Sequence, residues 1–107
     1  DILVLTETWL KTRMEQHPLF HIIQTEPSSH QGVAILLRRS TFTACKNIHE
    51  DFWTPELCAV QAILKESSSS DQKTVTIVGA YIRPSTKEDS QDYLLWFLDN
   101  LQFNTDR

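Results

Sequence analysis

The first ten residues, 1–10, read DILVLTETWL and organise the rest of the sequence. Residues 2–5 form an uncharged apolar run, the pattern of a short strand buried on both faces. The run ends at Thr6, so the carboxylate of Glu7 stands at the C-terminal edge of the predicted strand. Strand ends in layered architectures collect reactive groups, because the sheet fixes their position while the loop leaves them accessible. Glu7 is therefore a candidate ligand for a hard cation such as Mg²⁺; the alternative is a solvated residue that opens a loop.

Five further runs have the alternation, or the β-branched and aromatic content, of strands. They are residues 19–25 (LFHIIQT), 32–39 (GVAILLRR), 41–47 (TFTACKN), 57–66 (LCAVQAILKE) and 73–82 (KTVTIVGAYI). The run 41–47 is predicted to form a hairpin with 32–39. The length of 57–66 would also permit a helix, but its regular alternation and its serine-rich connection to 73–82 favour a second hairpin.

The segment after Pro84 has a helix pattern. Ser85 and Glu88 have the spacing of a capping box. Apolar residues then recur at the i, i+3, i+4 and i+7 positions of one helix face, namely Leu94, Phe97, Leu98 and Leu101. This face must pack on a sheet. Strands followed by a covering helix predict an α+β domain with largely antiparallel strand pairing.

Composition limits the class of protein. The chain has 107 residues, 40% of them hydrophobic, and a net charge of -4, which suits one small domain with a core. The negative charge argues against a protein that coats nucleic acid, but allows an enzyme that meets it through a local patch and a metal. The sequence contains no secretory signal and no apolar run of transmembrane length. Cys45 and Cys58 are its only cysteines, each expected to serve as a small buried hydrophobe in an intracellular, reduced chain.

Two more polar residues lie at the end of the run 73–82. Tyr81 shares a strand face with Gly79, and the missing side chain of that glycine is expected to leave open space beside the ring. The phenol would then reach a ligand; the alternative is a core tyrosine with its hydroxyl at the rim. Arg83 directly precedes a proline, which holds its backbone extended. Its guanidinium is a candidate phosphate contact or, alternatively, a surface charge.

Three motifs occur in one order: a strand ending in T-E-T-W, a glycine-led strand G-V-A-I-L-L-R and a strand ending in Y-I-R-P. Together they resemble the endonuclease/exonuclease/phosphatase family, which has the DNase I-like fold. They are most similar to the apurinic-type endonuclease domain of non-LTR retrotransposon polyproteins. The resemblance covers nearly the whole chain. It implies that residues 1–107 are the central part of one such domain, within a four-layer α/β/β/α sandwich, without its first strand and its C-terminal half.

The resemblance implies roles at the matching positions. Glu7 stands where family members place the glutamate that binds the catalytic divalent metal, Mg²⁺ or Mn²⁺. Tyr81 stands where the family has an active-site tyrosine that contacts the scissile phosphate, and Arg83 is a candidate substrate contact. The implied reaction is metal-assisted hydrolysis of a DNA phosphodiester bond. A nuclear location and a downstream reverse-transcriptase region in the same polyprotein follow from the retrotransposon likeness.

The family's early asparagine strand and its later G-D-x-N and S-D-H motifs lie outside these 107 residues. The sequence also starts in a strand pattern and stops just after a helix pattern. A piece of a longer chain is therefore expected, inert by itself, with an exposed apolar surface that makes it marginally stable or self-associating. Two alternatives stay open: a phosphatase or phospholipid-cleaving relative of the same fold, and a non-catalytic α+β interaction module, or degenerate remnant, whose acidic face binds a protein.

Overall fold

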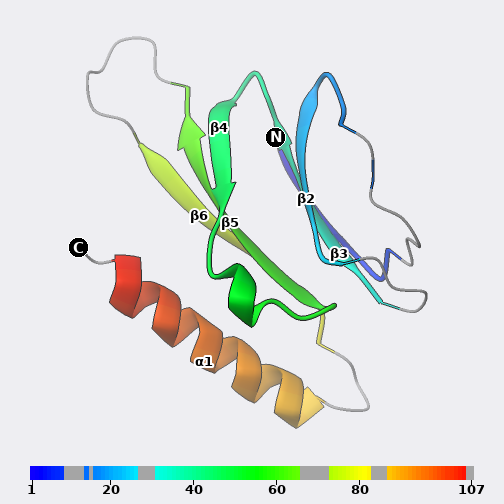
Figure 1. Cartoon of the computed structure of the whole chain (residues 1–107), viewed down its shortest axis with the longest axis vertical. Coiled ribbons are helices and arrows are strands. Elements are labelled where there is room, and N and C mark those ends of the chain that lie inside the picture. Colours follow the sequence, from blue (N-terminus) through cyan, green and yellow to red (C-terminus); the bar gives the residue numbers. More distant parts are fainter. Residues whose placement is uncertain (9–13, 15, 27–30, 66–72, 83–86, 106–107) are drawn as a thin grey trace.

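The computed structural model of the chain describes residues 1–8, 14, 16–26, 31–65, 73–82 and 87–105. Over these residues the elements are β1 (Ile2–Thr6), β2 (Phe20–Gln24), β3 (Val33–Arg38), β4 (Phe42–Asn47), the 3-10 helix η1 (Glu50–Phe52), β5 (Leu57–Leu64), β6 (Thr74–Ala80) and α1 (Lys87–Thr105). They form three layers: a first sheet, a second sheet, and α1 lying along the outer side of the second sheet (Figure 1).

Both sheets are antiparallel and three-stranded. The first has the order β1-β3-β2 and the second the order β4-β5-β6. The chain is therefore α+β with antiparallel pairing, as the sequence predicts. The expected β5–β6 hairpin is confirmed, with Leu57 opposite Ala80 and Cys58 opposite Gly79.

The predicted hairpin between 32–39 and 41–47 is wrong. β3 has β1 on one side and β2 on the other, so it has no free edge for a third partner. After a turn at Arg39 and Ser40, the chain instead enters the second sheet, where β4 pairs with β5. The ring of Phe42, the first residue of β4, is buried in the core between the two sheets.

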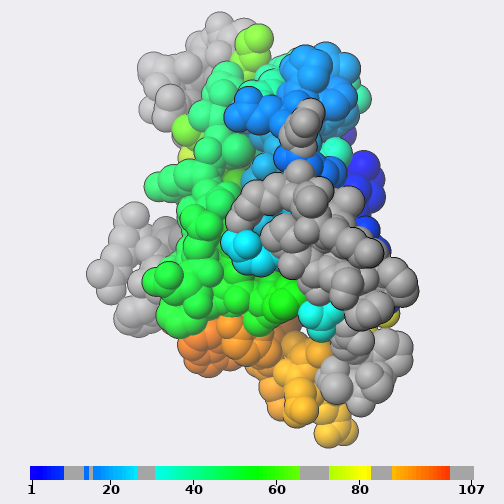
Figure 2. All heavy atoms as spheres, turned by 45° about the vertical axis from the view of Figure 1, so that its right-hand side comes forward, coloured from blue at the N-terminus to red at the C-terminus, as the bar shows by residue number. Residues whose placement is uncertain are grey.

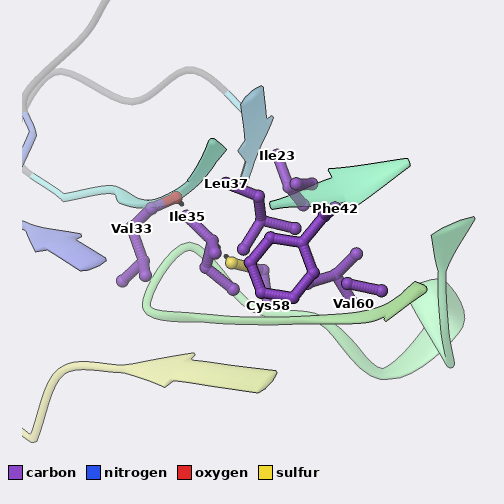
Figure 3. Packing of buried hydrophobic residues seen from close by; sticks show 8 residues of the cluster. Ile23, Val33, Ile35, Leu37, Phe42, Cys58 and Val60 are labelled. Carbon is purple, nitrogen blue, oxygen red and sulfur yellow. Dashed lines mark hydrogen bonds between the residues drawn. The ribbon is translucent and has the colours of Figure 1, made fainter. Parts of the chain in front are cut away.

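The main core lies between the two sheets, and Figure 3 shows how its side chains interdigitate. β5 contributes to two cores because its side chains alternate. Cys58, Val60 and Ala62 face the first sheet, whereas Leu57 and Ala59 face α1 and contact the cluster that holds Phe97 and Leu101. The alternation of 57–66 predicts the strand, and the structure shows that both of its faces are covered. Leu98 departs from its predicted place on the apolar helix face, since it is 40% exposed.

Both cysteines are free thiols. Cys58 is fully buried between the sheets, and burial raises its pKa to about 12 because the thiolate would be poorly solvated. Cys45 is half-buried, and its pKa is also raised, chiefly by desolvation. Cys58 therefore serves as the small buried hydrophobe that the sequence predicts, and Cys45 does so in part.

β1 departs from its prediction. The expected burial on both faces is wrong, since Ile2, Leu3, Val4 and Leu5 are 45%, 50%, 40% and 37% exposed. The reason is position: among the residues that the structure describes, β1 is an edge strand of the first sheet with β3 as its one neighbour. An apolar run signals a strand, but it does not distinguish an edge strand from a central one.

Gly79 also differs from its prediction, because the space beside it is filled. A Cβ atom at this position would lie 3.0 Å from Cγ1 of Val33, 3.1 Å from Cγ1 of Ile35 and 3.3 Å from Cγ1 of Val4. A side chain at this position would force its neighbours in β3 and β1 to shift by a few tenths of an ångström. We expect Gly79→Ala to lower the free energy of unfolding by about 1–3 kcal/mol through overpacking, measured by urea denaturation.

The double variant Gly79→Ala/Val33→Ala provides the control. Truncating Val33 removes one of the methyl groups that crowd the new Cβ, so the two effects are expected to sum to less than their separate costs. Strictly additive effects would contradict the proposed crowding between the sheets.

Candidate functional site

Glu7 directly follows β1 and is exposed to solvent. Its backbone has φ 52, a left-handed conformation that costs a residue other than glycine about 1–2 kcal/mol. The next residue fixes this bend, since the backbone N–H of Thr8 donates to the carbonyl oxygen of Gly32 at 3.2 Å. The backbone of Glu7 is therefore held at the strand end that the sequence predicts for it.

Tyr81 directly follows β6, also as predicted. Its backbone N–H donates to the carbonyl oxygen of Glu56 at 3.0 Å, and its half-buried ring packs against the core between the sheets. Tyr81 and Glu56 both line a cleft of about 220 Å³ that lies between the β5–β6 hairpin and the first turns of α1, where Asp89 and Tyr93 contribute to its wall.

The strand ends that carry Glu7 and Tyr81 lie at the same end of the molecule. Thr6 at the end of β1 pairs with Val33 at the start of β3, and Ala80 at the end of β6 pairs with Leu57 at the start of β5. The starts of β3 and β5 are in turn joined, because Gln31 donates through Nε2 to Oε1 of Glu56 at 3.4 Å. β1 and β6 accordingly run in the same direction (Figure 1).

A buried hydroxyl makes the second link between the sheets at this end. Thr25, directly after β2, is 2% exposed. Its Oγ1 accepts a hydrogen bond from the N–H of Val33 at 3.1 Å and donates to the carbonyl oxygen of Pro55 at 3.3 Å. The first bond is buried and the second part-buried, and together they hold the ends of β2 and β3 against the start of β5.

Sequence reasoning missed Glu56 and Gln31, which contact each other between the two predicted site residues. In the structure the register that pairs Leu57 with Ala80 places Glu56 beside Tyr81, but the sequence alone does not fix that register. Gln31 carried no signal either, because its contact joins two different sheets. Arg83, the third predicted site residue, and Ser85 of the predicted capping box lie outside the described residues.

A second cleft, of about 260 Å³, opens at the same end of the molecule, beside the ends of β2 and β4. Its walls combine the indole of Trp53 with polar side chains, including Gln24, Glu26, Asn47 and Glu50. The indole N–H of Trp53 donates to the carbonyl oxygen of Ile48 at 3.0 Å, which orients the ring. The strand ends thus carry two hollows, one beside Tyr81 and one beside Trp53.

The described residues at this end of the molecule provide some, but not all, of the oxygen ligands that a hard cation needs. Glu7 and Glu56 supply carboxylate oxygens, and Mg²⁺ typically takes one or two carboxylates and keeps several waters. Among the residues that the structure describes, no group of three or more His, Cys, Asp or Glu side chains is placed to hold a metal. A cation on Glu7 would therefore complete its shell with water, with substrate oxygens or with side chains beyond the described set.

No helix among the described residues is long and apolar enough to span a membrane. Comparison of the chain with protein-family models, with curated proteins and with solved structures finds no match.

Proposed function

We propose that this chain is the central part of a divalent-metal-dependent endonuclease domain of the DNase I-like family, which hydrolyses DNA phosphodiester bonds. The observation that carries the proposal is that Glu7 and Tyr81 follow strands that end at the same end of two packed sheets. The order of the T-E-T-W, G-V-A-I-L-L-R and Y-I-R-P motifs supports it. The parent would be a nuclear retrotransposon polyprotein with a reverse-transcriptase region downstream.

In this proposal Glu7 would hold Mg²⁺ or Mn²⁺, and the cation would neutralise negative charge on the phosphate and on the leaving oxygen. The Thr8–Gly32 hydrogen bond fixes the backbone next to Glu7, whose side chain is exposed at the strand end. The phenol of Tyr81 donates a hydrogen bond to a phosphate oxygen, and its half-buried ring restricts its orientation. Arg83 would add a forked contact to the same or a neighbouring phosphate. The general base would come from residues outside this sequence.

The proposal also gives a reason for the exposed apolar side chains of β1. A four-layer α/β/β/α sandwich would add further chain to the two sheets and one helix that the described residues form. We infer that this additional chain covers β1. The coding sequence upstream and downstream is the first place to test this, because a G-D-x-N followed by S-D-H in frame would complete the ligand and base set.

The decisive experiment is nicking of supercoiled plasmid with Mg²⁺ by a protein that includes these residues and the encoded flanking motifs. Glu7→Gln removes the negative charge at nearly constant size, and we expect it to lower the nicking rate about 100-fold or more. Removal of the metal with a chelator should abolish the reaction. The 107-residue chain by itself should not nick DNA at all.

The matched control is Asp99→Asn, which makes the same carboxylate-to-amide change on the exposed side of α1. It is expected to leave the nicking rate unchanged. Equal rates for the parent protein and Glu7→Gln would overturn the metal role of Glu7. Glu7-dependent nicking by the 107-residue chain would instead show that the separate chain is active.

A further inference from the structure

Two exposed aromatic side chains and one half-buried one form a patch where η1 meets α1. Phe52 of η1 is 41% exposed and Trp96 of α1 is 44% exposed, and their ring centroids lie 5.2 Å apart at an interplanar angle of 80°. Tyr93, one turn before Trp96, places its ring 5.5 Å from the indole. We call Phe52, Tyr93 and Trp96 the aromatic patch. Figure 2 shows α1, in orange, lying directly against the green segment that leads into β5.

A hydrogen bond and two ring contacts hold the aromatic patch in place. The hydroxyl of Tyr93 donates to the carbonyl oxygen of Phe52, which ties the helix to η1. His49 lies behind, with its ring 6.3 Å from that of Phe52 and 6.2 Å from the buried ring of Phe97. Exposed aromatic rings held in this way lose little conformational freedom on binding, and Trp and Tyr are the side chains that most often dominate the energy of protein interfaces.

Four carboxylates lie close in sequence to the residues of the aromatic patch. Glu50 and Asp51 precede Phe52 in η1, and Asp92 and Asp99 lie four residues before and three after Trp96, on the same side of α1. All four are exposed, and residues 88–105 contain no Lys or Arg. Within the part of the chain that the structure describes, none of the four forms an ion pair with a basic side chain.

We propose that the aromatic patch and its four carboxylates bind a basic amphipathic helix of a protein partner. The apolar side of that helix would cover Trp96 and Phe52, and its Lys or Arg side chains would face the carboxylates, with one cation over the indole. The charge argues for this occupant, because nucleic acid and anionic membranes would be repelled by the same carboxylates. The surface uses neither Glu7 nor Tyr81, although Tyr93 also lines the cleft beside Tyr81 and Glu50 lines the cleft beside Trp53.

The test uses a 16-residue helical peptide with leucines at i, i+3, i+4 and i+7 and lysines on the remaining faces. Binding to the 107-residue chain is followed through the indole N–H signals in a ¹H–¹⁵N spectrum. The sequence has three tryptophans, and the signal of Trp96 is assigned by its loss in Trp96→Phe. We expect the Trp96 signal to shift, Trp96→Ala to weaken binding about tenfold or more, and Asp92→Asn/Asp99→Asn to weaken it and flatten its salt dependence.

Two controls make the result specific. A peptide of the same composition, scrambled so that it has no apolar face, and a peptide with glutamates in place of the lysines should both bind weakly. Leu98 lies two residues after Trp96, on a different face of α1, and is 40% exposed. Leu98→Ala should therefore leave binding unchanged. The asparagine variants alter exposed side chains alone, so they keep the test valid even if Trp96→Ala disturbs the fold.

The proposal is overturned if the scrambled peptide binds as well as the amphipathic one, or if neither Trp96→Ala nor the asparagine pair weakens binding. It is also overturned if sedimentation shows that the patch is buried between two copies of the chain and Trp96→Ala releases monomers. Trp96→Phe should leave plasmid nicking by the longer protein unchanged. If peptide binding fails the test, the proposed DNA hydrolysis still stands, and if nicking fails its test, the proposed peptide binding still stands.

Discussion

Replacing Phe97 with alanine is expected to lower the free energy of unfolding by about 3–5 kcal/mol, the usual cost of removing a buried aromatic ring. Phe97 is 1% exposed and belongs to the cluster that also holds Leu57, Ala59 and Leu101. It is the largest fully buried side chain among the described residues, and it attaches α1 to the second sheet. Because small domains are stable by only about 5–15 kcal/mol, this single change should remove a large share of the total.

Urea denaturation followed by circular dichroism at 222 nm measures the effect, with Leu95→Ala as the matched control. Leu95 lies on the same helix but is 60% exposed, so its truncation should change the free energy of unfolding by less than about 0.5 kcal/mol. Similar losses for the two variants would contradict the packing of α1 on β5 through Phe97.

Gly32→Ala is the second change with a large expected effect, about 2–4 kcal/mol of destabilisation from backbone strain and crowding together. Gly32 has φ +139, a conformation that L side chains rarely adopt. An added Cβ would also collide with Oγ1 of Thr8, the residue that follows Glu7. The variant should therefore loosen the backbone bend at Glu7 as well as lower stability.

Thr8→Ala separates the two causes, because it removes the colliding oxygen and leaves the backbone conformation of Gly32 unchanged. In a double-mutant cycle measured by urea denaturation, Thr8→Ala is expected to recover about 1 kcal/mol or more of the cost of Gly32→Ala. The strain at φ +139 should remain. A cycle with no coupling would show that the two side chains do not meet in this loop.

Local pattern was sufficient for much of the fold. The alternation of 57–66 predicted the strand β5 and its hairpin with β6, because side-chain period and turn content are encoded within a few neighbouring residues. The helix face at Phe97 and Leu101 was predictable for the same reason. The partner of β4 and the exposure of β1 were not, since each depends on which strand edges are already occupied by segments far away in the sequence.

The candidate site divides in the same way. The positions of Glu7 and Tyr81 at strand ends follow from the apolar runs that precede them, so sequence alone places them correctly. Their shared end of the molecule depends on contacts between sheets, through Gln31 with Glu56 and through Thr25 with Pro55. No periodicity encodes those contacts. Glu56 was missed because an isolated glutamate before a strand looks like any solvated turn residue.

The edge strand β1 has a kinetic consequence. In the described sheet, β1 is paired with β3 on one side, and its other edge is unpaired. Its five residues contain no charge, proline or bulge that would hinder pairing of this edge with a strand of another chain. The rate of folding of one chain is first order in protein concentration, whereas the rate at which two β1 edges pair is second order in it. Dilution therefore favours the folded monomer, and crowding of newly made chains favours assembly through β1. A strand supplied in cis would remove that competition, because its local concentration does not fall on dilution.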